Sequence, residues 1–287
     1  MHVSVLGFGG AEIGYQGMDA SDARRLLAQA LDAGLNVIDT AACYGDGETL
    51  VGEVAHRRSD FLLFTKCGHA AGLGTPDWDR RTLAASIERS LRRLGTDHVD
   101  LLQLHSCSEE VLRRGDVLAV LERARADGKA RYIGYSGDGV AARYAVECGV
   151  FDALQTSVNI ADQEAITLTL PEAARRGMGV IAKRPIANAC WRHGDTAPEP
   201  YHRPYWERLR ALTFPFLHGD LDAAVATAVR FTLSVPGVHT AIVGTAKPDR
   251  WRQNAALVAG GQLPPDVYEA IRARWQAVAP PDWHGQR

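Results

Sequence analysis

Short apolar runs recur along the chain, and a longer stretch with an amphipathic pattern follows each of them. The runs lie at 3–9, 36–41, 61–66, 99–105, 130–136, 151–157, 179–184 and 240–244. Each run is almost continuously apolar and rich in leucine or β-branched residues, which is typical of a strand buried on both faces of a parallel sheet. The pattern therefore predicts eight buried strands.

The stretches between these runs carry apolar residues at helical spacing. Apolar positions recur every three or four residues from 83 to 94, and Gly95 would end that helix. Similar stripes run through 21–33 and 111–126. They predict amphipathic helices that pack one face against the sheet.

Strands that alternate with helices are typical of βα units, and eight units fit a closed (β/α)₈ TIM barrel. Because such a barrel needs about 250 residues, we predict a single domain over residues 1–287. A doubly wound open sheet is the alternative, but LGFGGAEIG after the first run lacks the GxGxxG pattern of a Rossmann domain. A Pro-, His-, Trp- and Tyr-rich segment at about 187–206 predicts a long loop over the carboxyl-terminal face, and a C-terminal helix is expected at about 264–278.

Polar residues stand at the ends of consecutive predicted strands, namely Asp39, Lys66 and His105, and Tyr44 lies in the loop after Asp39. Active sites of barrels form where strands end, so these four side chains are predicted to converge at one mouth. Each alone has an ordinary explanation: a turn cap for Asp39, a solvated lysine, a core histidine, a packed tyrosine. The prediction therefore depends on their occurring together.

These four residue types can act together as a proton donor. A phenol has an ordinary pKa near 10, and a neighbouring ammonium favours the phenolate, so Lys66 should lower the pKa of Tyr44. A carboxylate beyond the lysine would keep the ammonium charged, and a neutral histidine can hydrogen-bond a carbonyl oxygen. The set therefore suits protonation of a carbonyl oxygen while hydride reaches the carbon.

Several motifs give the chain a resemblance to the aldo-keto reductase family, from the first strand to about residue 260. NVIDTAACYGDGETLVG resembles the first signature of that family, and Lys66 and His105 complete its Asp-Tyr-Lys-His tetrad. Further matches are GKARYIGYS, the pair Gln155 and Asn159, and GTAKPDRWRQN. The resemblance implies a (β/α)₈ barrel that reduces an aldehyde or ketone reversibly with an extended nicotinamide cofactor.

The resemblance also implies where that cofactor would bind. Gly9, Gly10 and Ala11 would approach the nicotinamide ribose, Ser136 and Gln155 would bind the carboxamide, Thr245, Lys247 and Arg250 would surround the 2′-phosphate, and Gln253 and Asn254 would face the adenine. The predicted cofactor-binding set also includes Lys183, Arg184, Pro185, Ile186 and Gly244. Because arginine binds phosphate bidentately, NADP(H) is favoured over NAD(H). A solvated basic start of a helix would also explain Lys247, Arg250 and Arg252.

The chain departs from the family pattern at three places. Ser136-Gly137 replaces the common Ser-Asn, so one carboxamide contact is lost or replaced. Lys183 stands where the family usually places an aromatic residue that stacks on nicotinamide. Either another ring covers the nicotinamide or one of its faces stays open; alternatively, the cations Lys183 and Arg184 hold the pyrophosphate. The chain also starts almost at the first strand, without the amino-terminal hairpin of many members.

Composition excludes other classes of protein. A net charge of −2 gives no excess of cations for a nucleic acid backbone. No apolar run is long enough for a membrane helix and the start lacks a signal pattern, so we expect a cytoplasmic protein. The resemblance to the aldo-keto reductases implies a monomer whose partner is a small-molecule carbonyl or alcohol. The 5 cysteines are odd in number and form no CxxC pair, which disfavours a disulfide framework.

Two rival interpretations use the same residues. Cysteines, histidines and Asp39 near the mouth are types that bind zinc, but Lys66 would place an ammonium among them and no tight ligand pair is present. The second rival is a binding subunit that keeps barrel and cofactor as a redox sensor, as in some channel-associated relatives. The intact tetrad favours an enzyme.

Overall fold

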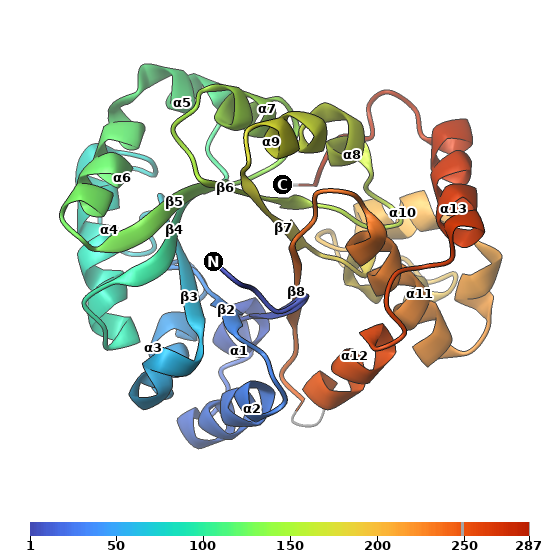
Figure 1. Cartoon of the computed structure of the whole chain (residues 1–287), viewed down its shortest axis with the longest axis horizontal. Helices are drawn as coiled ribbons and strands as arrows, with labels where there is room; N and C mark the ends of the chain where they lie inside the picture. The colour runs from blue at the N-terminus through green and yellow to red at the C-terminus, as the bar shows by residue number, and fades with distance from the viewer. Residues whose placement is uncertain (248–249, 287) are drawn as a thin grey trace.

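Eight parallel strands close into a barrel in the computed structural model, which describes residues 1–247 and 250–286. The strands pair in chain order, and β1 also pairs with β8 (Figure 1). They are β1 (Leu6–Gly9), β2 (Val37–Asp39), β3 (Leu62–Cys67), β4 (Val99–His105), β5 (Ala130–Ser136), β6 (Ala153–Ser157), β7 (Gly179–Lys183) and β8 (Thr240–Gly244). The predicted (β/α)₈ barrel is therefore confirmed, and the predicted strands agree with those observed to within a few residues.

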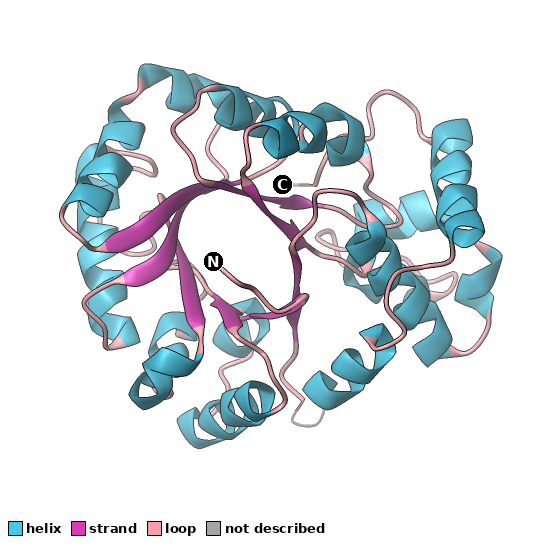
Figure 2. Cartoon of the chain, in the orientation of Figure 1, coloured by secondary structure: helices cyan, strands magenta, loops and turns pink. Residues whose placement is uncertain are grey.

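Helices surround the ring of strands (Figure 2). The α-helices are α1 (Ala11–Tyr15), α2 (Ala20–Asp32), α3 (Gly47–Gly52), α4 (Arg80–Leu94), α5 (Glu109–Arg114), α6 (Asp116–Ala126), α7 (Gly139–Glu147), α8 (Glu164–Leu168), α9 (Leu170–Arg175), α10 (Arg203–Leu212), α11 (Leu221–Ser234), α12 (Arg250–Val258) and α13 (Pro265–Val278). Short 3₁₀ helices are η1 (Ala55–Asp60), η2 (Ala187–His193) and η3 (Pro215–His218).

One predicted helix is divided in the structure. The apolar stripe over 111–126 predicts a single helix, but the chain forms α5 and α6 with Gly115 between them at φ +77°. Glycine adopts this left-handed conformation without a Cβ penalty, so it ends α5. The apolar stripe continues across the break, because Leu112 of α5 and Val117 and Leu121 of α6 are buried in the same core.

The barrel interior consists of an apolar layer below a polar one. Val37, Phe64, Leu101, Ala153, Ile181 and Ile242 form a separate buried cluster. Side chains two residues apart on a strand point to the same face, so the next positions toward the carboxyl ends are Asp39, Lys66, Gln103, Gln155, Lys183 and Gly244. This two-residue step places a layer of mainly polar side chains above the apolar cluster.

Strand register brings these polar positions level with one another. Lys66 pairs with Gln103, His105 with Ser136, and Ser136 with Gln155. Because neighbouring strands lie about 4.8 Å apart, each of these side chains is within reach of the next. The barrel therefore gathers residues that are far apart in the sequence.

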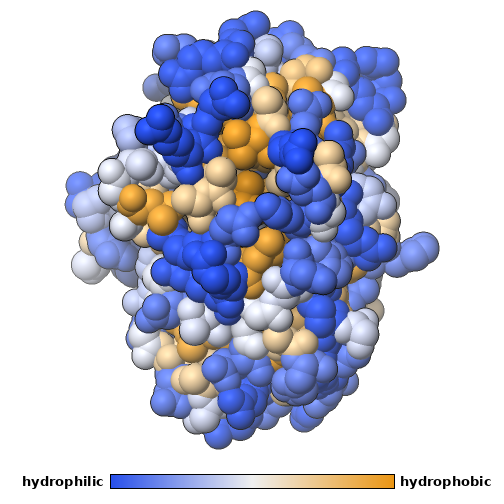
Figure 3. All heavy atoms as spheres, turned by 90° about the vertical axis from the view of Figure 1, so that its left-hand side faces the viewer, coloured by the Kyte–Doolittle hydropathy of each residue, from blue (hydrophilic) through white to orange (hydrophobic). Residues whose placement is uncertain are grey.

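The outer face over α4 and α6 is amphipathic, as the sequence pattern predicts. Leu83, Ile87 and Leu91 of α4 are buried against the sheet. Figure 3 shows this side of the molecule, where hydrophobic groups are separated by hydrophilic ones. Nothing in this face departs from an ordinary solvated helical layer.

Candidate active site

Lys66 lies at the centre of the polar layer, at the end of β3. Its Nζ forms an ion pair with Asp39 and donates a hydrogen bond to the carbonyl of Thr40 at 3.0 Å. The side chains of Lys66 and Asp39 are only 1% and 4% exposed. Burial opposes the charge on Lys66, but the carboxylate of Asp39, together with Tyr44 and Cys43, outweighs burial and raises the lysine pKa. The ammonium therefore stays charged inside the barrel.

Two glutamine amides complete the surroundings of Asp39. Gln103 Nε2 and Gln155 Nε2 donate to Asp39 Oδ1 at 3.0 and 2.9 Å, and Ser136 Oγ donates to Gln155 Oε1 at 3.1 Å. Hydrogen bonds to the charged form stabilise a carboxylate. Gln103 is missing from the sequence prediction, although a glutamine inside the apolar run VDLLQLH was a signal for it.

Tyr44 lies beside this pair, in the loop between β2 and α3. Lys66 Nζ is 5.0 Å from the centre of its ring, and the His105 ring meets it edge-on at 5.7 Å. Tyr15, which the sequence prediction missed, is a second ring at 5.7 Å. The four residues predicted at the strand ends are thus neighbours.

The predicted direction of the Tyr44 pKa is wrong. Burial raises the pKa of Tyr44 above its ordinary value, and Lys66 lowers it by less. Burial destabilises the Tyr44 phenolate by more than the ammonium of Lys66 stabilises it, because the nearby Asp39 carboxylate offsets much of the lysine charge. The Tyr44 hydroxyl is therefore protonated throughout the neutral range.

His105 ends β4 and is framed by the loop after β3. Trp78 Nε1 donates to the carbonyl of His105 at 2.8 Å, and the His69 ring meets the His105 ring at 5.0 Å. Burial, followed by the charge on Lys66, holds the pKa of His105 well below its usual 6.5. His105 is accordingly a neutral imidazole at neutral pH.

Lys183, at the end of β7, has a partner that the sequence did not predict. Its Nζ forms an ion pair with Asp138 Oδ2 at 2.7 Å. Asp138 Oδ1 also accepts from Thr156 Oγ1 at 2.8 Å and from the Ser157 amide at 2.7 Å. The sequence indicates pyrophosphate as a candidate partner of Lys183 and does not indicate this carboxylate.

Arg184 follows in a left-handed conformation, with φ +55°. Nη1 donates to Ser157 Oγ at 3.0 Å and to the main-chain carbonyl of Gln286 at 2.7 Å, while Nε donates to Tyr201 Oη at 3.2 Å. Within residues 1–247 and 250–286, no carboxylate forms an ion pair with this guanidinium. The Arg184 guanidinium at the mouth is therefore hydrogen-bonded to neutral acceptors and keeps an unneutralised charge among the described residues.

The segment 283–286 packs on residues that follow β5, β6 and β7, namely Asp138, Asp162 and Arg184. Arg208 Nη2 donates to the carbonyl of His284 at 2.6 Å, and the amide of Gln286 donates to Asp162 Oδ2 at 3.1 Å. An added Cβ at Gly285 would come within 2.4 Å of Asp138 Cβ. Only glycine fits there, so this segment packs directly on the Asp138–Lys183 pair.

Asp162 gives the folded protein a predictable response to pH. Burial, and then the nearby charge of Asp138, raise its pKa from 3.8 to about 7. A carboxyl with a higher pKa in the folded protein binds protons more tightly there, so stability falls as pH rises between these values. Between pH 5 and pH 8 this loss amounts to about 2.5 kcal/mol, and Asp162→Asn should remove it. Urea unfolding at pH 5 and pH 8 measures it, and equal losses in parent and variant would contradict the assignment.

The residues predicted at the far end of the cofactor lie around β1, β8 and α12. An added Cβ at Gly9 would lie 2.7 Å from Ile242, so strand packing alone requires this glycine. Gly10 and Ala11 begin α1, Gly244 ends β8, and Thr245 Oγ1 accepts from the Lys247 amide at 3.1 Å. Pro248 and Asp249 of the GTAKPDRWRQN motif lie outside the described residues.

The remaining predicted cofactor residues lie on α12 and directly after β7. Arg250, Gln253 and Asn254 occupy the first turns of α12, with Asn254 buried. The Pro185 carbonyl accepts from Thr232 Oγ1 at 2.9 Å, and Ile186 packs on the core. Pro185 and Ile186 thus have structural partners of their own.

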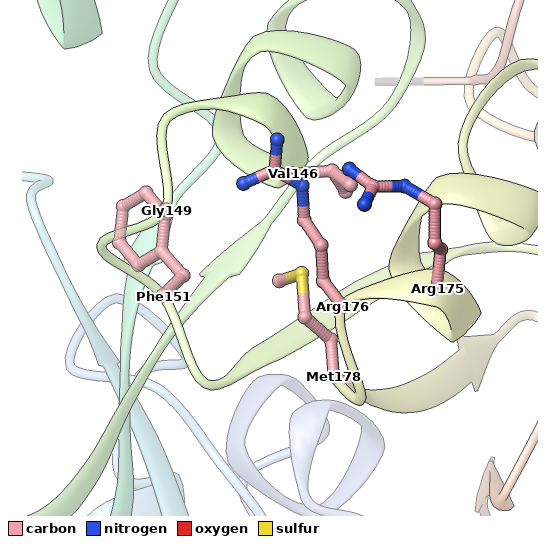
Figure 4. A pocket seen from close by; sticks show the side chains of 6 residues that line it. All are labelled: Val146, Gly149, Phe151, Arg175, Arg176 and Met178. Atoms are coloured by element: carbon pink, nitrogen blue, oxygen red, sulfur yellow. The ribbon is translucent and has the colours of Figure 1, made fainter.

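Two hollows of about 350 and 400 Å³ lie on the opposite side of the barrel from these residues. The first is lined by Val146, Gly149, Phe151, Arg175, Arg176 and Met178 (Figure 4). These residues lie in or near the connections that enter β6 and β7, at the amino ends of the strands. The hollows are therefore separate from the candidate site.

Sequence comparison decides the family. Residues 5–276 match the profile of the Aldo/keto reductase family. The chain belongs to this family. Among curated relatives, this aldo-keto reductase is 28% identical to D-threo-aldose 1-dehydrogenase from a Pseudomonas species, over 90% of each chain. It is 26% identical to L-galactose dehydrogenase from Arabidopsis thaliana, over 90% of this chain and 85% of the relative.

Other relatives extend the comparison. A putative voltage-gated potassium channel subunit beta from Schizosaccharomyces pombe is 27% identical, over 94% of this chain and 89% of the relative. The solved structure of an aldo-keto reductase from Bacillus halodurans in its holo form superimposes with a TM-score of 0.83 at 25% identity, covering 99% of this chain and 96% of that one. Membership makes this chain an oxidoreductase for carbonyl and alcohol groups with a nicotinamide cofactor.

The described part of the chain contains neither a membrane-spanning helix nor a metal-binding cluster. No helix there is long and apolar enough to cross a membrane. Residues 1–247 and 250–286 contain no group of three or more His, Cys, Asp or Glu side chains arranged to hold a metal ion. The cysteines near the mouth are free thiols.

Proposed function

We propose that this aldo-keto reductase reduces an aldehyde or ketone reversibly with NADPH, using Tyr44 as the general acid. The observation that carries the proposal is the buried Asp39–Lys66 pair beside the Tyr44 ring, with neutral His105 edge-on to that ring. When bound, NADPH supplies the hydride. The chain's own groups supply the proton and hold the carbonyl oxygen.

The raised pKa of Tyr44 is compatible with this role. A protonated phenol is the form that an acid needs, and an alkoxide is a far stronger base than a phenolate. The charged Lys66 stabilises the phenolate that forms as Tyr44 releases its proton to the carbonyl oxygen. Asp39, held by Gln103 and Gln155, keeps Lys66 charged and in place.

His105 is proposed to donate a hydrogen bond to the same carbonyl oxygen. As a neutral imidazole it carries one ring N–H, and it adds no positive charge beside Lys66. Its position against Tyr44 brings both donors to one point of the mouth. His105 then orients the carbonyl while Tyr44 delivers the proton.

The residues at the mouth fit a nicotinamide cofactor. Arg184 is a half-buried guanidinium with neutral acceptors and no ion pair among the described residues, which suits a pyrophosphate. Gln155 Nε2 has a second N–H that can donate to the carboxamide oxygen of nicotinamide. Ser136 Oγ keeps its lone pairs and can accept from the carboxamide nitrogen. Tyr201, with Arg184 5.7 Å from its ring centre, is an aromatic side chain available above the mouth.

Substrate tests should include sugars as well as simple aldehydes and ketones, because two relatives are named for aldose or galactose oxidation. NADPH consumption with carbonyls, and NADP⁺ reduction with alcohols and sugars, measure both directions. We expect turnover with NADPH. Absence of turnover in either direction, in protein shown to bind NADPH, would contradict the proposed function.

We predict that Arg250 selects the phosphorylated cofactor. Arg250 begins α12 near Lys247 and Thr245, and forms no ion pair within the described part of the chain. Arg250→Ala should weaken NADPH binding by about 1.5–3 kcal/mol, the range for a hydrogen bond to a charged group. NADH affinity should change little. Calorimetric titration with both cofactors tests this, and equal losses for both would place Arg250 away from the 2′-phosphate.

A further inference from the structure

Cys43, which immediately precedes Tyr44, has no role in the proposed reaction so far. Its Sγ lies 3.4 Å from His105 Nδ1, within hydrogen-bond distance for sulfur. The contact joins the loop after β2 to the end of β4, across the candidate site. It therefore involves the same imidazole that is proposed to hold the carbonyl oxygen.

Both partners are uncharged at neutral pH. Burial raises the pKa of the Cys43 thiol above its ordinary 9.0, and burial lowers the pKa of His105. A neutral thiol has one S–H, whereas a neutral imidazole has one N–H and one lone pair. Because sulfur is a weak acceptor and an imidazole lone pair is a strong one, the favoured arrangement has S–H donating to Nδ1.

Main-chain contacts fix the positions of both residues. Tyr15 Oη donates to the carbonyl of Cys43 at 3.3 Å, and Trp78 Nε1 donates to that of His105 at 2.8 Å. His105 Nε2 has no hydrogen-bond partner among the residues that the structure describes. If Nδ1 accepts from Cys43, the ring proton is on Nε2.

We propose that Cys43 is a positioning residue that fixes the tautomer of His105, so that its free Nε2–H donates to the substrate carbonyl. The inference rests on the proposed function for the identity of the acceptor, but the tautomer itself is a property of the protein alone. Without the S–H donor, the ring can also place its proton on Nδ1. His105 would then present a lone pair to the carbonyl oxygen and repel it.

The tautomer can be read directly by long-range ¹H–¹⁵N NMR of protein labelled at histidine. We expect an unprotonated Nδ1 and a protonated Nε2 for His105 in the parent and in Cys43→Ser, whose hydroxyl keeps a donor. Cys43→Ala should give a mixture of tautomers. Cys148→Ala is the matched control, because that thiol donates to Ala145 O at 3.2 Å on α7, away from the mouth.

Kinetics provide a second measurement. Cys43→Ala should lower kcat/KM for a carbonyl by about 3- to 10-fold, the worth of one neutral hydrogen bond, with NADPH affinity unchanged. Cys43→Ser should recover most of the loss. In a His105→Asn background, Cys43→Ala should cause no further loss, because Cys43 acts through that ring.

The outcomes separate this inference from the proposed function. A proton on Nδ1 in the parent, or an unchanged Nε2–H tautomer in Cys43→Ala, would overturn the role of Cys43. So would an equal kinetic loss with and without His105. If instead the predicted spectra are found but no carbonyl is reduced with NADPH, the proposed function fails while the tautomer assignment stands.

Discussion

Replacing Tyr44 with phenylalanine should lower the rate of carbonyl reduction by about 10²–10⁴-fold, the usual contribution of a positioned general acid. The substitution keeps the ring that packs against His105 and Lys66, and removes only the hydroxyl. Folding and NADPH affinity should therefore survive. Stopped-flow NADPH oxidation under single-turnover conditions, with any accepted carbonyl, measures the chemical step.

Tyr15→Phe is the matched control for this experiment. Its ring lies 5.7 Å from the Tyr44 ring, and it also has a hydroxyl near the mouth. Burial raises the pKa of Tyr15 to about 12, so it too is protonated at neutral pH. Tyr15→Phe loses only the hydrogen bond to the Cys43 carbonyl, so we expect its rate to stay within about tenfold of the parent, well below the loss for a positioned acid. If Tyr44→Phe stays within that range instead, Tyr44 is not the acid.

Replacing Lys66 with methionine should cost a similar factor of about 10²–10⁴. The ammonium is the cation that opposes burial of the Tyr44 phenolate, so its removal should raise the pKa of Tyr44 further and make proton release harder. Tyr44→Phe and Lys66→Met combined should lose little more than either alone, because the two groups act as one unit. Single-turnover rates of the three variants test this.

The Lys66 variant needs a control for stability, because methionine leaves Asp39 buried without its cation. Removing one partner of a buried pair destabilises by about 3–5 kcal/mol. Asp39→Asn combined with Lys66→Met removes the leftover charge and should recover much of that stability while the rate stays low. Recovery of the rate along with the stability, or a Lys66→Met rate within threefold of the parent, would contradict a role for Lys66 in proton transfer.

The sequence carried enough information to predict the barrel and the meeting of four polar side chains at its mouth. Short apolar runs between amphipathic stretches indicate strands that are buried on both faces, and this pattern can be recognised from neighbouring residues alone. In a closed barrel, a polar residue at the end of such a run, such as Asp39, Lys66 or His105, lies at the carboxyl-terminal mouth. All strands end on the same face, so these residues meet there once the fold class is known.

Other features depended on which groups pack against one another in three dimensions. The Asp138–Lys183 pair, the acceptors around Arg184 and the contact between Cys43 and His105 all join positions that lie far apart in the sequence, and no local pattern reveals such neighbours. The sign of the Tyr44 pKa shift is the clearest case. Residue types alone indicated an ammonium near a phenol, but the balance between that attraction and the loss of water depends on burial, which only the tertiary structure decided.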